Sequence, residues 1–491
     1  MVDIPPEIWL NIAHFLPDGE IVRCMSVNSS FFNLGMDVLY KEMKVDVQTN
    51  RIAECTQTLD KLSNPLIASR VQCLDLLLYG DGDPTTSTVV EQPNKSARIL
   101  QSITRSSKLL GSIARNNPSR VLDVSQPPDF EEMLSRFVAR IPNHSKIRSF
   151  TIQAAFVPIS YNFVSLFVSI GTAFGTQLHT LSLAGQIELY HGLLHSNPSF
   201  PQLKELRLWF HNSFREVSHL PVNGGHIATF VNRLSPHLEL LGIRSHMVNL
   251  SGLFSQLSLF PSLVHLDINM PFDALEDDFS FHRFLLNTSH TLKKLSIRRN
   301  PSNTAFHAYR KKWLSDCWAE PKCFAKLQSL AVHPGFLGHD VNVQCDFIRR
   351  VSMSLEEFSF EGRLLEGRDA SLVIGALSQC AKLTVLNLSV YCLTIDVLDQ
   401  LAVALPNLRK LGLRVDVLDA RGGSSFFFGA LKDRSYASWR LEDLSIWQLR
   451  WGRCKANHDF MMAFPRSIPS VCSFFGNGHM DSSSCVEVRT A

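Results

Sequence analysis

Two hexapeptides, LTVLNL at residues 383–388 and LRKLGL at residues 408–413, share the pattern Leu-x-x-Leu-x-Leu. Their last positions alternate between apolar and polar residues, which is typical of a short strand with one buried face. Between them, residues 395–405 carry apolar residues suited to a helix packed on that strand: Val397, Leu398, Leu401, Val403, Ala404 and Leu405. The pair therefore predicts one strand-plus-helix unit.

The same pattern recurs over most of the chain. Copies begin at residues 71, 147, 178, 203, 238, 263, 292, 327, 355, 383, 408 and 441. A single strand-plus-helix unit cannot hide its apolar face, whereas a stack of such units forms a continuous core. We therefore expect an α/β solenoid with a curved parallel sheet and helices outside.

These copies resemble leucine-rich repeats, whose period of about 20–29 residues is met or slightly exceeded here. The asparagine that usually follows the hexad in that family is mostly replaced, for example by Trp209, Ser245 and Met270. That asparagine normally bonds to the turn backbone. The resemblance therefore implies an irregular solenoid without an asparagine ladder.

A different pattern occupies residues 4–43, IPPEIWLNIAHFLPDGEIVRCMSVNSSFFNLGMDVLYKEM. Pro5 and Pro6 suit a first helical turn, Pro17-Asp18-Gly19 ends one helix and starts another, and Asn28 can cap a third. The three short helices carry more apolar surface than a unit of this size can bury internally. The segment could be a cap that shields the end of the repeats, or it could bind a partner.

The order Pro-x-Glu-Ile, Ile-x-x-x-Leu-Pro-Asp, Val-x-x-x-Phe and Leu-aromatic in this segment resembles the F-box, and the irregular repeats resemble those of fungal F-box proteins. That resemblance implies docking on a Skp-family adaptor, which a cullin scaffold holds. The implied adaptor contacts are Ile4, Pro5, Ile8, Ile12, Leu16, Ile21, Val27 and Phe31. Asn28, Ser29 and Phe31 depart from the family, which often has Cys-Lys/Arg and Trp at these sites.

The patterns together divide the chain into four parts. We predict a helical F-box at residues 1–46, linker helices and degenerate first repeats at 47–144, the solenoid at 145–475 and a C-terminal tail at 476–491.

Charge and composition narrow the partners and the compartment. The chain has 48 basic and 45 acidic residues, so it lacks the excess of positive charge that binding to nucleic acid or an anionic membrane requires. No apolar stretch reaches the ~20 residues that a membrane helix needs. Eleven cysteines are scattered without a Cys-x-x-Cys pair, which indicates thiols in a reducing compartment, cytoplasmic or nuclear.

No catalytic or cofactor motif is recognisable. Gly-x-Ser-x-Gly and the phosphate-binding Gly-x-x-x-x-Gly-Lys-Ser/Thr are absent, and the histidines lack metal-ligand spacing. Cys24 falls inside a predicted helix of the F-box segment, so we expect it to pack rather than react. We predict neither an enzyme nor a bound cofactor or metal.

Recognition of a target should fall to the sheet face, where the residues between the hexad leucines point away from the core. Large side chains there suit binding hot spots. The candidates are Trp209, Arg298, Arg414, Trp447 and Trp451.

The resulting hypothesis is a substrate-recognition subunit of an SCF-type (Skp-cullin-F-box) ubiquitin ligase. It would bind the adaptor through the F-box and a protein target through the repeats. The alternative is a repeat scaffold that binds proteins outside ubiquitin transfer, because both functions need the same apolar helices.

Overall fold

The fold is taken from a computed structural model of the chain. The structure describes residues 5–48, 52–79, 135–137, 139, 146–155, 163–211, 224–245, 248, 250–270, 278–299, 320, 323–333, 341–419, 423–448, 458–475 and 486–487. It forms two compact units, Met1–Val217 and Ser218–Ala491, called the N-terminal and C-terminal units below.

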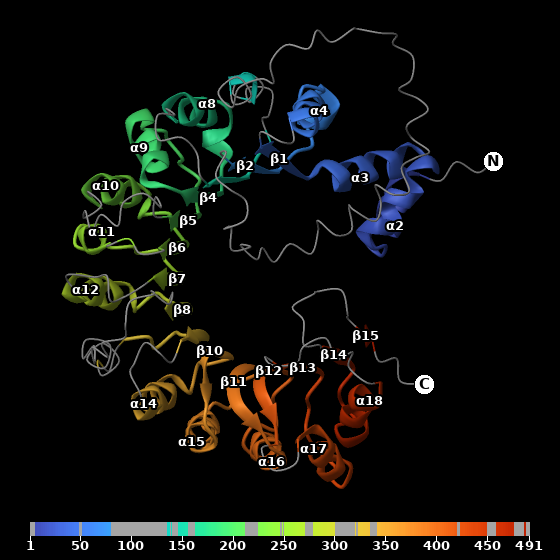
Figure 1. The fold of residues 1–491 in the computed structure, drawn as a ribbon. Helices are drawn as coiled ribbons and strands as arrows, with labels where there is room; N and C mark the ends of the chain where they lie inside the picture. The colour runs from blue at the N-terminus through green and yellow to red at the C-terminus, as the bar shows by residue number, and fades with distance from the viewer. Residues whose placement is uncertain are drawn as a thin grey trace. The chain divides into compact units, whose positions relative to one another are not determined.

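The N-terminal unit begins with three helices, α1 (Pro6–His14), α2 (Asp18–Arg23) and α3 (Ser29–Tyr40), with the short 3-10 turn η1 (Cys24–Ser26) before α3 (Figure 1). Pro6 occupies the first turn of α1 and Glu7 adds an acid where the helix dipole favours one. Asn28 caps α3, because its Oδ1 accepts the backbone N–H of Phe31 at 2.9 Å.

Strands follow at once in the same unit. Their bounds are β1 (Glu42–Gln48), β2 (Cys73–Tyr79), β3 (Ser149–Ala155), β4 (Thr180–Gly185) and β5 (Glu205–Phe210), and all neighbours pair in parallel. The helices between them include α4 (Ile52–Leu62), α5 (Pro65–Ala68), α8 (Val164–Phe174) and α9 (Ile187–Ser196). The predicted domain boundary at residue 46 therefore falls inside β1.

The C-terminal unit continues the strand-and-helix pattern. Its parallel strands are β6 (Leu240–Ser245), β7 (His265–Met270), β8 (Lys294–Arg299), β9 (Ser329–Val332), β10 (Glu357–Leu365), β11 (Val385–Leu393), β12 (Lys410–Leu418), β13 (Asp443–Gln448) and β14 (Ser473–Phe475). β15 (Val486–Glu487), within the predicted tail, pairs antiparallel with β14.

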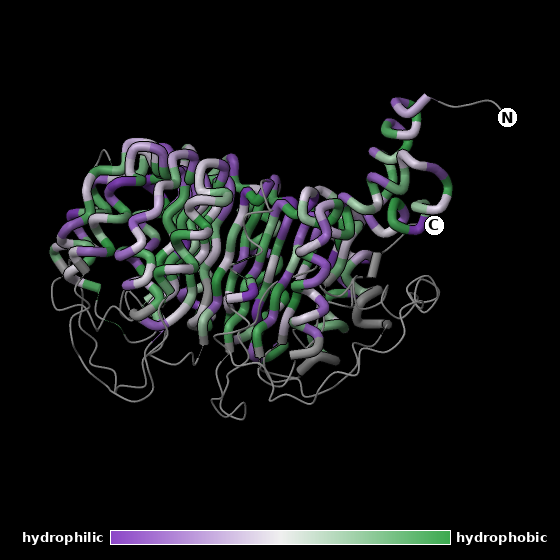
Figure 2. Tube along the Cα trace, turned by 90° about the horizontal axis from the view of Figure 1, so that it is seen from above, coloured by the Kyte–Doolittle hydropathy of each residue, from purple (hydrophilic) through white to green (hydrophobic). Residues whose placement is uncertain are grey.

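Helices lie along one side of this sheet, and no helix of the described residues covers its other face, which we call the open face (Figure 1). They are α10 (Gly224–Leu234), α11 (Ser251–Phe254), α12 (Asp278–Thr288), α14 (Val341–Val351), α15 (Gly367–Leu377), α16 (Ile395–Ala404), α17 (Gly423–Lys432) and α18 (His458–Ser467). Figure 2 shows hydrophobic and hydrophilic residues alternating along the strands.

The apolar positions of the hexads form the core. In every predicted copy, all three of these side chains are at most 3% exposed. Equivalent positions of successive hexads are register partners, as Leu386 and Leu411 are. The prediction of a leucine-rich α/β solenoid built on a parallel sheet is confirmed.

The turns after the hexads differ between repeats, as the missing asparagines predict. Ser245 bonds to its own turn, since its Oγ donates to the carbonyl oxygen of Val248 at 3.1 Å and accepts the Val248 N–H at 3.0 Å. Met270, at the matching place in the next repeat, is buried instead. One helix expectation was wrong: Val403 on α16 is 84% exposed, because Val397, Leu398 and Leu401 already fill the face against the sheet.

Candidate binding surfaces

Helix α1 carries two apolar stripes rather than one. Trp9, Ala13 and Leu16 follow helical spacing and pack into the small core of the three helices, around Ile21 and Phe31. The Trp9 and Phe31 rings meet edge to face, with centroids 5.6 Å apart. This inner stripe explains why the three helices hold together.

The second stripe of α1 points outward. Ile8, Ile12 and Phe15 share a helix side by their spacing, and all three are exposed, Phe15 to 84%. We use the name helical apolar surface for all the exposed large apolar residues of these three helices, which lie on more than one side of α1. Its members are Ile8, Leu10, Ile12, Phe15, Val27 and Phe32.

The predicted adaptor contacts fall into two groups. Pro5, Ile8, Ile12 and Val27 are exposed and available to a partner, and Leu16 is half-buried. Ile21 and Phe31 are 8% and 3% exposed because they form the core of the helices. Ile4 lies outside the described residues.

Three exposed residues were not among the predicted contacts: Leu10, Phe15 and Phe32. The excess of apolar positions on α1 was a signal for Phe15, since two stripes on one short helix cannot both face inward. Leu10 and Phe32 stand outside both stripes.

Arg70 fastens these helices to the first repeat. From the turn after α5 its guanidinium donates to the Asn33 carbonyl oxygen at 3.0 Å and to Asn33 Oδ1 at 2.9 Å, and it also pairs with Asp37. All these partners lie on α3. Within the N-terminal unit, the helical apolar surface therefore belongs to a segment anchored to the first strands.

The open face of the sheet in the C-terminal unit carries three rows of side chains, set by strand register. The first row comprises His265, Lys294, Ser329, Glu357, Val385, Lys410 and Asp443, in that order across the strands. The second comprises Gly242, Asp267, Ser296, Ala331, Ser359, Asn387, Gly412 and Ser445. The third comprises Arg244, Asn269 and Arg298 on β6–β8, and Ser389, Arg414 and Trp447 on β11–β13.

The strand register places three of the predicted target-binding residues at the same position along their strands. Arg298, Arg414 and Trp447 all stand in the third row, and Arg414 and Trp447 are direct neighbours on β12 and β13. Trp209 occupies the same hexad position in the N-terminal unit, where its ring stacks on His211 at a centroid distance of 4.8 Å. Trp451 lies outside the described residues.

Apart from Asp267 and Asn387, the second row consists of glycine, alanine and serine residues. The side-chain amide of Asn387 donates to Ser359 Oγ at 2.9 Å. A side chain at Gly412 would collide with Asn387 Oδ1, so the glycine leaves room for this amide. The second row therefore forms a shallow strip beside the larger side chains of the third row.

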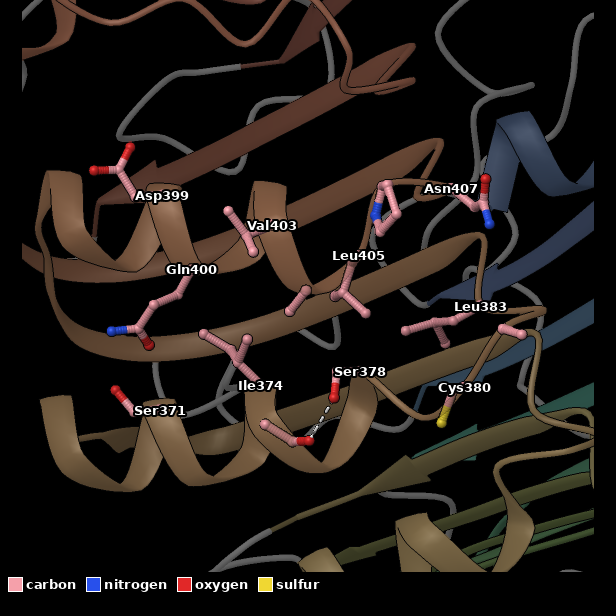
Figure 3. Close-up of a pocket in the computed structure, with 14 residues that line it drawn as sticks. Ser371, Ile374, Ser378, Cys380, Leu383, Asp399, Gln400, Val403, Leu405 and Asn407 are labelled. Carbon is pink, nitrogen blue, oxygen red and sulfur yellow. Dashed lines mark hydrogen bonds between the residues drawn. The ribbon is translucent and has the colours of Figure 1, made fainter.

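A groove of about 880 Å³ lies on the helical side of the sheet, between α15 and α16 (Figure 3). Ile374, Val403 and Leu405 line it together with polar groups such as Asp399. Burial raises the pKa of the Cys380 thiol in its wall to about 11, so this thiol stays protonated and is a poor nucleophile. None of the predicted target-binding residues lines the groove.

The described part of the chain holds no metal cluster, membrane-spanning helix or disulfide. No group of three or more His, Cys, Asp or Glu side chains there could hold a metal ion. Within the same ranges, no helix is long and apolar enough to cross a membrane. The cysteines that the structure describes are all free thiols.

No family model matches the chain, and no curated protein matches it in sequence. Solved structures with a similar arrangement include the leucine-rich repeat-containing protein LegL7 from Legionella pneumophila (13% identity, TM-score 0.38), which covers 68% of this chain and 96% of its own. The yeast Rad7 and Elc1 complex matches at 18% identity and TM-score 0.34, covering 66% of this chain and 92% of that one.

The TLR13–ssRNA13 complex matches at 15% identity and TM-score 0.33, over 67% of this chain but only 39% of that one. All three likenesses are too low to carry an argument about this chain. The fold assignment rests on the strand register and the buried hexads.

Proposed function

We propose that this chain is the target-recruiting subunit of an SCF-type ubiquitin ligase. The helical apolar surface binds a Skp-family adaptor, which a cullin scaffold holds, and the open sheet face of the repeats binds a protein target. The observation that supports the adaptor site is the second apolar stripe on α1, with Ile8, Ile12 and Phe15 exposed.

The energetic argument starts from these exposed side chains. Burying a large aliphatic or aromatic side chain stabilises a complex by about 1.5–3 kcal/mol, so several of them on one short segment favour association. A cap that only shielded the repeats would turn such residues toward the sheet. Here Ile8, Phe15 and Val27 remain exposed although the helices are already joined to β1 through α3.

The departure from the F-box pattern at Asn28 has a structural role in the proposal. The family often has Cys-Lys/Arg after the valine, whereas Asn28 here caps α3 through Phe31 N–H. This cap fixes where α3 starts and keeps the Phe31 ring in the core. The missing base removes one possible polar contact with the adaptor, and the binding would then depend on the apolar side chains.

The chain itself performs no chemistry in this proposal. Cys24 is half-buried and packs against the core of the three helices, so it is badly placed to form a thioester. Catalysis would come from the conjugating enzyme that the cullin complex carries. Holding a target lysine close to that enzyme raises its effective concentration. Such a complex would work in the cytoplasm or the nucleus, where thiols stay reduced.

The test is a pull-down of the full chain with the adaptor and cullin. The variant Ile8→Asp/Val27→Asp changes two exposed residues and should abolish adaptor binding while the chain keeps its circular dichroism spectrum. Val168→Asp is a matched control, because Val168 is also exposed but lies on α8, a helix of the repeats, rather than on α1–α3. Leu16 is unsuitable, since it packs against the helical core.

The outcomes separate the alternatives. Adaptor and cullin recovered with the chain and with Val168→Asp, but not with the double variant, would support the proposal. Adaptor recovered without cullin would favour a scaffold outside ubiquitin transfer. Unchanged adaptor binding by the double variant would show that the docking site is wrong, and turnover by the purified chain alone would contradict a non-catalytic role.

A further inference from the structure

The third row of the open sheet face concentrates positive charge. Three of its six members are arginines, Arg244, Arg298 and Arg414, whereas the acids that strand register places on this face, Asp267, Glu357 and Asp443, belong to the other two rows. The first row lies four residues earlier on each strand and balances Lys294 and Lys410 against Glu357 and Asp443. Since the whole chain is nearly neutral, this separation of charge is a local feature.

The arginines of the third row are reachable from solvent. The Arg244 side chain is 43% exposed even though its guanidinium pairs with Asp267 at 3.2 Å. Arg414 is half-exposed and has no hydrogen bond or ion pair within the described part of the chain. Trp447 stands beside it, so a guanidinium and an indole face the same space on neighbouring strands.

The second row next to these side chains gives a partner room to approach. Ala331, Gly412 and Ser445 offer only small side chains, and Asn387 lies flat over Gly412. From β6 to β13 the second row crosses seven strand spacings, about 34 Å at about 4.8 Å each. An extended peptide of about ten residues spans this distance.

We propose that an extended acidic segment of a partner protein binds across β6–β13 over the second row. Aspartate and glutamate carboxylates of the segment pair with Arg244, Arg298 and Arg414, and an apolar side chain packs against Trp447. Guanidinium groups bind carboxylates with two parallel hydrogen bonds, which gives both strength and direction. This inference rests on the proposed function, because it specifies the class of target that the repeats recruit.

The charges favour a protein segment over a nucleic acid. A phosphate backbone carries a charge at every step, and proteins that bind it commonly make about six to ten phosphate contacts. The third row offers three arginines on β6, β8 and β12, none of them on neighbouring strands. Glu357 and Asp443 in the first row would repel a continuous phosphate chain, whereas a peptide can place its carboxylates only where the arginines stand.

The probe is a fluorescent peptide of about twelve residues, long enough for the span, with Glu at every third position and one Leu near its end. Its binding to the full chain is followed by anisotropy and should weaken as salt is raised. Arg414→Gln and Arg298→Gln should each reduce the affinity about fivefold, and the double variant by more. Arg414→Lys keeps the charge and should retain part of the affinity.

Two controls fix the interpretation. Arg349→Gln removes the same charge on α14, on the helical side, and should leave peptide binding unchanged; its side chain is 44% exposed and pairs with Asp346. A second peptide carries Gln in place of Glu and should bind much more weakly. Adaptor binding is measured in parallel, and the arginine variants should retain it.

Several results would overturn the inference: no binding of the acidic peptide, equal binding of the Gln peptide, or the same loss in Arg349→Gln. Tighter binding of a single-stranded oligonucleotide that depends on Arg298 and Arg414 would assign the row to nucleic acid instead. Failure of adaptor binding with intact peptide binding would contradict the proposed ligase function but leave the acidic-segment site standing.

Discussion

Gly362, on β10, is a residue whose missing side chain has a structural reason. Its φ is +104°, a conformation that residues with a Cβ rarely adopt. A Cβ at this position would also collide with the imidazole ring of His333, which follows β9. The backbone of β10 and the side chain of the neighbouring repeat therefore depend on the same glycine, next to the bulge where β10 changes register against β11.

We expect Gly362→Ala to lower the free energy of unfolding by about 2 kcal/mol or more, because it combines backbone strain with a steric clash. Gly375→Ala is the control. Gly375 lies in α15 and nothing is within 4 Å of the added Cβ, so this substitution should raise the free energy of unfolding by about 0.5–1 kcal/mol. Urea denaturation followed by circular dichroism measures both. Equal effects of the two substitutions would contradict this account.

At the scale of elements, one side chain ties α3 to the turn after α5. Arg70 is largely buried, 18% exposed, and its guanidinium contacts both Asn33 and Asp37. Arg23, in contrast, pairs with Glu20 on the surface of α2 with its side chain 77% exposed. Exposed pairs of this kind contribute little, whereas loss of a partly buried network leaves polar groups unpaired.

We therefore predict that Arg70→Ala destabilises the attachment of α3 by about 1–3 kcal/mol. Amide hydrogen exchange should become faster in α3 and β1, while β6–β13 keep their protection. Arg23→Ala should leave exchange in α3 unchanged. If exchange in α3 did not respond to Arg70→Ala, the anchor would have to lie elsewhere.

The elements also show where sequence reasoning reached its limit. The three N-terminal helices were predicted from proline placement and apolar spacing, and both signals are local. The side of α1 that faces inward was not, because Ile8-Ile12-Phe15 and Trp9-Ala13-Leu16 have equally good helical spacing. Only the packing against Ile21 and Phe31 distinguishes them. Val403 on α16 was placed inward by the same kind of pattern and is exposed.

At the scale of the whole molecule, the repeated hexad made both the fold and the rows predictable. Parallel strands in register place equivalent hexad positions side by side, so Arg298, Arg414 and Trp447 could be assigned to one face from sequence. The Asn387–Ser359 hydrogen bond and the close approach of His333 to Gly362 could not be, since each joins residues about 28 or 29 positions apart through exact side-chain geometry.

Repeat stacking also predicts how the molecule should lose structure. Each repeat contacts its neighbours, so damage in one repeat should spread to adjacent repeats first. Leu266 on β7 and Leu74 on β2 occupy equivalent hexad positions, both are 0% exposed, and they belong to different units. Replacing either by alanine should cost about 2–5 kcal/mol through lost burial and the cavity left behind.

We expect Leu266→Ala to accelerate amide exchange in β6–β8 and in α11 and α12, while β2–β4 keep their protection. Leu74→Ala should do the reverse. The reason is that the free energy lost in one unit is shared through strand pairing and helix packing within that unit, so the opening should be sub-global. Exchange measured by mass spectrometry on the intact chain would resolve both regions in one experiment. If either substitution accelerated exchange uniformly from β2 to β13, the two units would unfold as a single cooperative body, and the separation inferred from their compactness would not extend to their stability.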